Sequence, residues 1–304
     1  MDINQPELEL FKKNYIAGKS QLLFHTFAAD VHTPVSALIK LKNENYTFLF
    51  ESVEKGSQKG RYSVIGLKPD LIWECKNNIC KFKNLNISSK NVTLKKKPLD
   101  SLRDLFNNNN LKIPNVIPSI SSGFFGYMGY EMIRYFENVN LKKLNSLDLP
   151  DSIFIRPSIT LVFDNVNDKL FVTKIVCKNK LRAKDSFEKA KNDIYGVIEK
   201  INRPISKESF SSLNIKKNIN VFRNVKSNTN FSEFKKMVNK AKKYIYEGEI
   251  FQVVISRIFK KKIKTNSLSI YRALRYLNPS PYLFYMNFKK FSIVGSSPEI
   301  LIKL

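Results

Sequence analysis

The hydrophobic positions in the first third of the chain alternate with polar ones or form short apolar runs, a pattern typical of strands. Five stretches are interpreted as strands on this basis: 34–41, 46–53, 61–67, 71–75 and 79–82. Asn77 and Asn78 separate the last two stretches, and paired asparagines favour a tight hairpin turn. The pattern therefore predicts a strand-rich N-terminal region.

Three longer stretches have apolar residues at helical spacing. Residues 6–14, 99–106 and 180–200 are predicted helices, and the asparagine run at 107–110 ends the second of them. Residues 152–163 and 169–176 predict another pair of antiparallel strands, joined across a polar turn. Strands and helices in this arrangement favour an α+β fold with mainly antiparallel sheets and flanking helices; the more specific expectation, a two-layer sandwich, comes from a family resemblance described below.

The apolar periodicity fades between residues 203 and 230, where Pro204 is followed by many Ser and Asn residues. We interpret 204–230 as a linker or surface excursion. The expected organisation is then an N-terminal region at 1–203 and the start of a second domain at 231–304.

The last 74 residues give sharper signals. Asn230 with Glu233 predicts a capping box for a helix that Gly248 ends. The expected order after that helix is a buried strand at 250–259, a helix at 268–277, a hairpin at 282–288 and 291–295, and a further strand at 299–304. Because a sheet that stops at such a strand would leave a long unpaired edge, we expect the complete protein to continue beyond Leu304.

Composition limits the function classes. Apolar residues make up 43% of the 304 and charged residues 26%, as in globular proteins that bury a core. The net charge of +26 raises nucleic acid as a partner, but the lysines are scattered and their runs are short. We interpret them as solvated surface; a basic nucleic-acid-binding module remains the alternative from a different class, although nucleic acid is not the expected partner.

Three cysteines and two histidines give no zinc or redox spacing. The first residues lack the basic and apolar regions of a secretory signal, and no apolar run is long enough to span a membrane. The expected location is the cytoplasm, with no membrane partner.

Four short motifs carry candidate chemistry, each with a plain structural alternative. Residues 49–52 (L-F-E-S) place Glu51 and Ser52 directly after an apolar run, where an ordinary exit from a strand is the favoured interpretation. Residues 123–131 space their glycines by three, which does not match a dinucleotide-binding loop and instead favours close backbone approach.

The other two motifs lie near the C-terminal end. Gln252, in F-Q-V-V-I-S-R, is a polar residue in a predicted buried strand and needs hydrogen-bond partners, from the protein or from a ligand. Glu299, in G-S-S-P-E, is a carboxylate beside apolar strands, where a raised pKa would suit a general acid. From these residues alone, a solvated turn is the favoured interpretation of Glu299.

Taken in order, the motifs L-F-E-S, G-R-Y-S, E-I-F-Q-V-V-I-S, N-P-S-P-Y-L-F-Y and I-V-G-S-S-P-E resemble the anthranilate synthase component I family of chorismate-utilising enzymes. The resemblance extends from about residue 24 to residue 304. It implies conversion of chorismate and ammonia to anthranilate and pyruvate in tryptophan biosynthesis. It also implies Mg²⁺ as cofactor, a glutamine amidotransferase component as the ammonia-supplying partner, and feedback inhibition by L-tryptophan.

The resemblance also implies roles for individual residues. Glu299 matches the family's general acid, and Gln252 stands where water-adding relatives carry a lysine base. A neutral glutamine cannot deprotonate water, whereas ammonia is already a nucleophile, so Gln252 favours an ammonia-using enzyme. The allosteric tryptophan site would combine two patches far apart in sequence: Glu51, Ser52, Pro281, Tyr282 and Leu283.

The family's P-I-x-G-T segment and its acidic Mg²⁺-binding motif do not occur in these 304 residues. We therefore expect no metal ligands in this chain, and no turnover of chorismate by the isolated chain. Aminodeoxychorismate synthase component I, which shares the fold and the chemistry, remains the alternative within the class.

Overall fold

The computed structural model describes residues 8–41, 45–52, 60–88, 90–109, 111–141, 147–205 and 224–302. The chain forms two compact units, one comprising Met1–Ser209 with Ser267–Leu304, and the other Phe210–Asn266. This division differs from the expected one, because residues 267–304 pack with the N-terminal region rather than with residues 231–266. Most of the expected linker, residues 206–223, lies outside the described residues.

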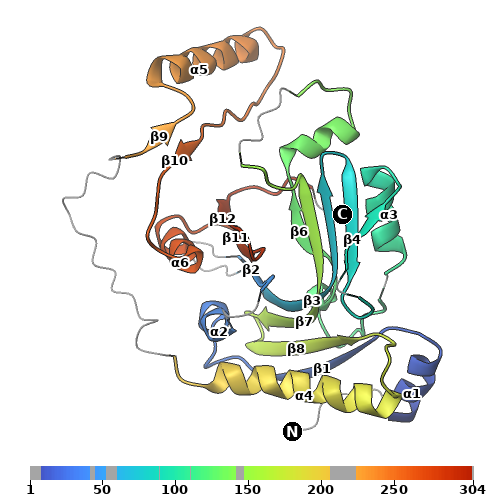
Figure 1. The fold of residues 1–304 in the computed structure, drawn as a ribbon. Coiled ribbons are helices and arrows are strands. Elements are labelled where there is room, and N and C mark those ends of the chain that lie inside the picture. The colour runs from blue at the N-terminus through green and yellow to red at the C-terminus, as the bar shows by residue number, and fades with distance from the viewer. Residues whose placement is uncertain are drawn as a thin grey trace. The chain divides into compact units, whose positions relative to one another are not determined.

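The first unit is built on one large antiparallel sheet (Figure 1). Its strand order is β1-β8-β7-β3-β2-β11-β12, with β4 and β5 continuing beside β3 and with β6 on β7. The strands are β1 Gln21–Ala28, β2 Phe48–Glu51, β3 Tyr62–Lys76, β4 Ile79–Asn84, β5 Val92–Leu94, β6 Phe125–Met128, β7 Ser152–Asp164, β8 Lys169–Val176, β11 Tyr282–Asn287 and β12 Ser292–Ser297. The predicted α+β class with a mainly antiparallel sheet is confirmed.

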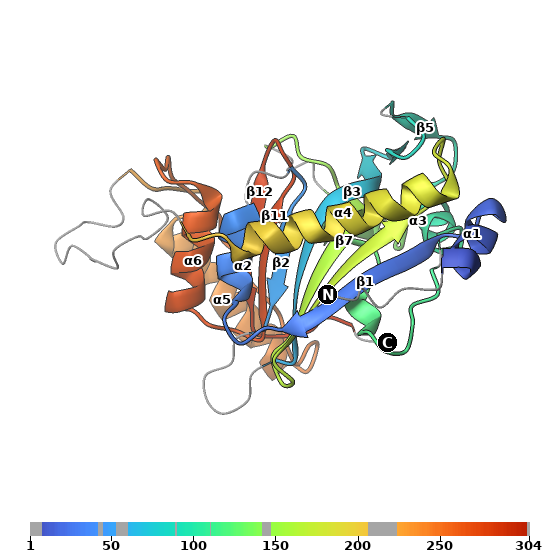
Figure 2. The ribbon, with the colours of Figure 1, turned by 90° about the horizontal axis from the view of Figure 1, so that it is seen from below.

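Four helices cover one face of this sheet. They are α1 Leu8–Ile16, α2 Pro34–Leu41, α4 Ala183–Asn202 and α6 Ser267–Leu277, and Figure 2 shows α4 running across the strands. Alternate residues of each strand point to opposite faces, so Leu49 and Ile65 pack under the helices while Phe48 and Val64 pack on the other side. Burial on both faces explains the nearly continuous apolar runs of the central strands.

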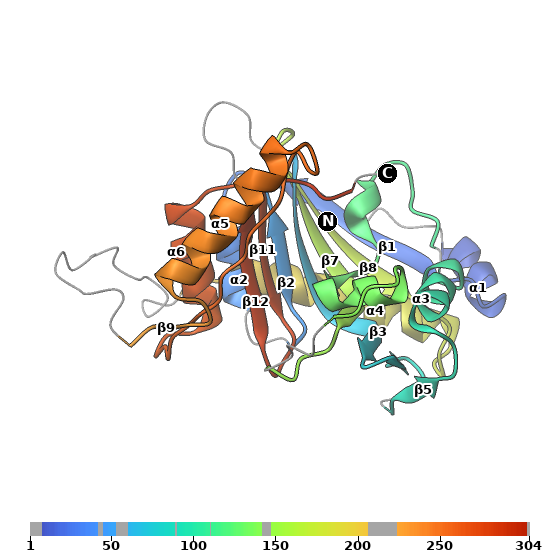
Figure 3. The ribbon, with the colours of Figure 1, turned by 90° about the horizontal axis from the view of Figure 1, so that it is seen from above.

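A smaller cluster lies around helix α3, Pro98–Asn107, where Trp73 packs with Leu102 and Leu105. Two short 3₁₀ helices, η1 Ser119–Ser121 and η2 Tyr130–Tyr135, flank β6. Figure 3 shows the strands from the side opposite α4. The predicted role of the glycines in this region is confirmed at Gly126, because a Cβ there would lie 1.8 Å from the backbone oxygen of Ile153.

Residues 34–41 form helix α2, so their interpretation as a strand is wrong. Pro34 occupies the first helical position, where its missing N–H costs nothing. The Thr33 hydroxyl accepts a hydrogen bond from the Ser36 amide at 3.1 Å, and the Ser36 hydroxyl accepts one from the Thr33 amide at 3.0 Å. This reciprocal cap, together with burial of Ala37, Leu38 and Leu41, stabilises a helix rather than a strand.

The strands predicted at 61–67 and 71–75 are one strand, β3. Its pairing with β7 shifts register between Pro69 and Leu71, which marks a β-bulge. Pro69 cannot donate a backbone hydrogen bond, and the bulge allows the strand to continue through it. The predicted hairpin turn at Asn77 and Asn78 is confirmed, with φ angles of 48° and 66° that suit such a turn.

The second unit contains helix α5, Phe231–Tyr246, and the short strands β9 Lys226–Ser227 and β10 Phe259–Lys260. The predicted capping box is confirmed: Glu233 N donates to Asn230 Oδ1 at 2.9 Å, and Asn230 N donates to Glu233 Oε2 at 2.8 Å. Gly248 follows the helix with a φ of 77°, as expected for a helix end.

Two expected strands do not form in the described residues. Of the stretch 250–259, only Phe259 belongs to a strand, and Phe251 and Val254 are exposed. Residues 299–302 are also irregular and exposed, and residues 303–304 lie outside the described part. Apolar alternation indicates strand propensity, but a strand also needs a neighbour to receive its backbone hydrogen bonds.

Candidate functional site

The two patches of the expected tryptophan site meet in the sheet. Strand β2 lies between β3 and β11, and Glu51 pairs directly with Leu283 across the antiparallel β2–β11 ladder. More than 220 residues of sequence separate these two positions. The structure therefore brings the L-F-E-S and N-P-S-P-Y-L motifs side by side, as the expected site requires.

The Glu51 carboxylate is buried between the sheet and helix α6. Its side chain is 1% exposed and forms an ion pair with Nε of Arg275 on helix α6. Its second oxygen, Oε2, and the buried hydroxyl of Tyr271 form no hydrogen bond of normal geometry with a described residue, but Tyr271 lies close enough to Glu51 to help stabilise its charged form. A buried carboxylate with one unsatisfied oxygen costs free energy unless a ligand or water completes its bonding.

Burial raises the pKa of Glu51, and the charge and hydrogen bond of Arg275 only partly offset this effect. Burial also raises the pKa of the Tyr271 hydroxyl, and the neighbouring Glu51 charge raises it further. The tyrosine therefore stays neutral, and Arg275 supplies the positive charge beside Glu51.

Helix α6 brings Tyr271 and Arg275 to this carboxylate because they are four residues apart and share one helical face. Tyr271 is fully buried against the sheet, where its ring lies 5.9 Å from that of Tyr285 on β11. Sequence reasoning missed both residues. The motif Y-R-A-L-R shows an amphipathic helix, but nothing distinguishes Arg275 from the many other basic residues of the chain.

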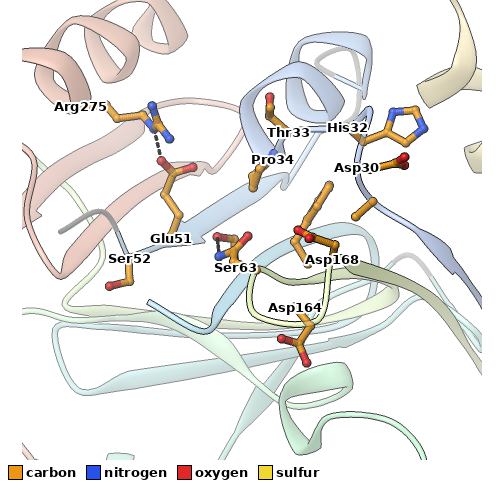
Figure 4. A pocket seen from close by; sticks show the side chains of 13 residues that line it. Asp30, His32, Thr33, Pro34, Glu51, Ser52, Ser63, Asp164, Asp168 and Arg275 are labelled. Carbon is orange, nitrogen blue, oxygen red and sulfur yellow. Dashed lines mark hydrogen bonds and ion pairs between the residues drawn. The ribbon is translucent and has the colours of Figure 1, made fainter. Parts of the chain in front are cut away.

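A cavity of about 380 Å³ opens beside this ion pair (Figure 4). Its walls come from the end of β1, the start of α2, the end of β2, the β7–β8 turn and α6. The residues lining it are Ala29, Asp30, His32, Thr33, Pro34, Glu51, Ser52, Ser63, Phe163, Asp164, Asn165, Asp168 and Arg275. Its volume lies within the range typical of small-molecule sites.

Asp164 is a structural carboxylate of this wall. It accepts hydrogen bonds from the amides of Val166 and Asn167 and from the Asn167 side chain, and it pairs with Arg61 at 3.4 Å. Its burial would raise its pKa, but these hydrogen bonds outweigh that effect and hold the pKa below its usual value. The ionised carboxylate of Asp164 therefore holds the β7–β8 turn in place.

The other four residues predicted for the tryptophan site, Ser52, Pro281, Tyr282 and Leu283, lie in or next to the paired strands β2 and β11. A Cβ at Gly60 would lie 1.9 Å from Cβ of Ser52, so Gly60 is needed for the close packing of the serine. Leu283 is buried on the face that the helices cover, whereas Tyr282, the next residue, points to the opposite face and is 41% exposed. Pro281, Tyr282 and Leu283 are not among the residues lining the cavity.

The loop that carries Pro281 is held by the following hairpin. The Ser296 hydroxyl donates to the backbone oxygen of Asn278 at 2.8 Å, and the Ser280 hydroxyl donates to that of Ser297. The N-P-S-P segment is thus fixed between α6 and β12, directly beyond the helix that carries Arg275.

The two predicted catalytic residues belong to different units. Gln252 lies in the irregular part of the second unit and is exposed. Glu299 follows β12 in the first unit, is exposed, and accepts a hydrogen bond at its backbone oxygen from the Ser297 hydroxyl at 3.0 Å. Their roles remain predictions.

No group of three or more His, Cys, Asp or Glu side chains within the described ranges is arranged to hold a metal ion. The described residues thus show no such group for the Mg²⁺ that the sequence resemblance implies. No described helix has both the length and the apolar character needed to cross a bilayer.

Comparison with known proteins agrees with the sequence motifs. Anthranilate synthase component 1 of Cereibacter sphaeroides is 35% identical over 301 residues, which cover 97% of this chain and 59% of that protein. The protein of the same name from Aquifex aeolicus is 31% identical over 284 residues, covering 93% and 56% of the two chains. This chain thus spans a little over half the length of the curated relatives it matches.

A solved structure shows the same likeness in three dimensions. The crystal structure of anthranilate synthase component I from Streptococcus pneumoniae superposes with a TM-score of 0.61 at 25% identity, covering 90% of this chain and 57% of that one. Residues 46–304 match the family model described as chorismate binding enzyme. The chain therefore belongs to the chorismate binding enzyme family.

Proposed function

We propose that this protein acts as the first component of an anthranilate synthase, which converts chorismate and ammonia to anthranilate and pyruvate for tryptophan biosynthesis. The observation that carries the proposal is the match to relatives named anthranilate synthase component 1, at 31–35% identity over more than 90% of this chain. The word component in that name supports a second subunit, which we propose is a glutamine amidotransferase that supplies ammonia.

In this proposal Glu299 is the general acid that protonates the C4 hydroxyl of chorismate as it leaves. Gln252 contributes a neutral hydrogen-bonding side chain where a lysine would favour attack by water. The proposal includes the Mg²⁺ dependence that the family resemblance implies. No metal ligand is assigned to this chain.

The protein is further proposed to bind L-tryptophan as a feedback inhibitor, at the junction of β2 and β11. The support is the direct pairing of Glu51 with Leu283, and the cavity that Glu51 and Ser52 line beside it. Because the junction joins the N-terminal residues to α6 and β11, a ligand there can favour one arrangement of these elements over another.

The activity is tested on the protein encoded by the complete reading frame, with chorismate, Mg²⁺ and ammonium as substrates and products identified by mass spectrometry. Anthranilate with an equal amount of pyruvate supports the proposal, and Glu299→Gln is expected to lower kcat about 100-fold or more. Formation of 4-amino-4-deoxychorismate without pyruvate would instead identify an aminodeoxychorismate synthase component.

The isolated 304-residue chain is a separate test. We expect it to form no anthranilate, because the family's P-I-x-G-T and acidic metal-binding motifs do not occur in it. Mg²⁺-dependent anthranilate formation by the purified chain would contradict this expectation.

A further inference from the structure

Two cysteines lie directly opposite each other near the tip of the β3–β4 hairpin. Cys75 pairs in register with Cys80, and both are free thiols with no exposed surface. The backbone oxygen of Cys75 accepts a hydrogen bond from the Asp151 amide at 2.8 Å, where β3 faces the start of β7. The N–H and C=O of a strand residue point to the same side, so those of Cys75 point away from β4. Cys75 and Cys80 are therefore a non-hydrogen-bonded pair of the ladder.

A pair of this kind has the geometry that a disulfide needs. Its Cα atoms are typically about 4.5 Å apart, and disulfides span Cα separations of about 4.4 to 6.8 Å. Both side chains point into the cluster that Trp73 forms under helix α3. The turn at Asn77 and Asn78 thus brings together two cysteines whose spacing along the chain matches no redox motif.

The two thiols are not equivalent. The Cys75 thiol and the Ser101 hydroxyl both lie close enough to the Cys80 sulfur to stabilise its charged form. The Ser101 oxygen accepts from Nε1 of Trp73 at 2.7 Å, which leaves its proton available to the sulfur. The interaction with Cys75 lowers the pKa of Cys80, and burial only partly opposes it. The interaction with Cys80 raises the pKa of Cys75, as do burial and the Asp151 charge, so Cys80 ionises first.

A cavity of about 520 Å³ opens beside this pair. Trp73, Phe82, Ser101 and Leu105 are among the residues that line it. Ser101 is therefore both part of the cavity wall and a neighbour of the Cys80 sulfur. Because neither sulfur has exposed surface, a small hydroperoxide can approach Cys80 along this wall more readily than a bulky disulfide can.

We propose that Cys75 and Cys80 form a peroxide-reactive dithiol that closes a disulfide across the hairpin. The Cys80 thiolate attacks one oxygen of hydrogen peroxide, the O–O bond breaks, and the sulfur becomes a sulfenic acid while the departing hydroxide is protonated to water. The Cys75 sulfur then attacks the Cys80 sulfur, loses its proton, and displaces the hydroxyl group as a second water. Two thiols lose two electrons in total, and these reduce one peroxide to two waters.

The disulfide is expected to change the packing around Trp73 rather than the pairing of the strands. Trp73 and Cys75 are two residues apart in β3 and share one face, whereas the register of Cys75 with Cys80 already exists. Ser63, which lines the candidate cavity described above, lies at the opposite end of β3. The redox site is therefore independent of the proposed function.

The test treats the folded, reduced chain with hydrogen peroxide near pH 7, blocks the remaining thiols with N-ethylmaleimide in urea, and maps the products by mass spectrometry. We expect a peptide in which Cys75 and Cys80 are joined, and Trp73 fluorescence should fall as it forms. Disulfide formation should be at least about tenfold faster in the folded chain than in the same chain in urea, because only the fold activates Cys80. If both thiols still react with N-ethylmaleimide after a treatment that oxidises the unfolded chain, the proposal is overturned.

Three alanine variants, each checked for folding by circular dichroism, assign the steps. Cys75→Ala should stop at a sulfenic acid on Cys80, which dimedone traps, and Cys80→Ala should leave Cys75 at least about tenfold less reactive. Cys177→Ala, which removes the third cysteine, is the matched control and should form the disulfide within about twofold of the unmodified rate. Oxidation of Cys75 at the unmodified rate in Cys80→Ala contradicts the assigned order, and a disulfide that requires Cys177 overturns the pairing.

Discussion

Asp70 and Arg156 form a buried ion pair in the large sheet. Asp70 lies at the bulge of β3, and Arg156 on β7 donates to its two oxygens at 2.8 and 2.7 Å. The Arg156 side chain is only 5% exposed and the Asp70 side chain only 4%. The bulge turns a carboxylate into the interior, and the bidentate arginine makes this burial tolerable.

Replacement of Asp70 by alanine should destabilise the protein by about 3–5 kcal/mol, because it leaves the buried Arg156 guanidinium without its anionic partner and with only long contacts to Asn109 and Cys177. The apolar double replacement, Asp70→Leu with Arg156→Met, should cost much less, since it removes both charges. Urea unfolding measures the difference. Asp100→Ala, which breaks a surface pair with Arg103, is the control and should change stability by less than about 1 kcal/mol.

The raised pKa of Glu51 gives a second prediction at this scale. A carboxyl whose folded pKa lies above its unfolded value stabilises the fold below the unfolded pKa, and this contribution is lost as pH rises through the folded pKa. The unmodified protein should therefore lose stability relative to Glu51→Gln as pH rises from 4.5, the ordinary glutamate value, through the raised value. Thermal melts over this pH range test it, and parallel curves for the two proteins would show that the Glu51 pKa is not raised.

Helix α5 shows how local sequence can specify an element. Its capping box satisfies amides of the first turn with side chains only three residues apart, and a glycine ends it. Both signals are local, so the sequence predicted them correctly. Helix α2 has the same kind of cap through Thr33 and Ser36, but its short apolar stretch is equally compatible with a strand.

Asn230→Ala should destabilise the first turn of α5 by about 1 kcal/mol, because the Glu233 amide loses its acceptor. Asn230→Asp should keep most of the stability. Hydrogen exchange of the first-turn amides measures the effect at the helix itself. Ser232→Ala, an exposed change in the same turn, is the control, and equal exchange in the Asn230→Ala and Ser232→Ala variants would contradict a stabilising cap.

At the scale of the whole molecule, the large sheet joins residues from both ends of the chain. Strand β11 pairs with β2, and Met286 packs in the same cluster as Phe48 and Val64. Segments that are distant in sequence thus share one core. If the unit unfolds in two states, these segments lose their structure together in one cooperative transition.

Met286→Ala should therefore lower the stability of the N-terminal strands as well, by about 2–4 kcal/mol. Trp73 is the only tryptophan of the chain and lies in β3, so its fluorescence reports this unfolding. The circular dichroism and fluorescence transitions should shift together. An unchanged Trp73 transition would show that β11 and β12 unfold separately from β3, and Met237→Ala on α5 of the other unit is the control.

The sequence by itself determined the features that depend on neighbouring residues. These are most helices, the hairpins at Asn77 and between β7 and β8, the cap of α5, and the motifs that identify the family. Each depends on side chains a few residues apart, whose periodicity and turn chemistry can be read along the chain.

Only the tertiary structure decided which distant segments meet. The short apolar runs at 48–51 and 282–287 indicate two strands but not that they pair, because the residue pattern of a strand does not specify its partner. The apolar stretch at 250–258 forms no regular strand, and its described hydrogen bonds to a neighbouring segment are made only at its end, by Arg257 and Ile258 to residues 227–228. Arg275 became part of the candidate site for the same reason: helix α6 packs on this sheet and places one of the chain's many basic side chains against the buried Glu51.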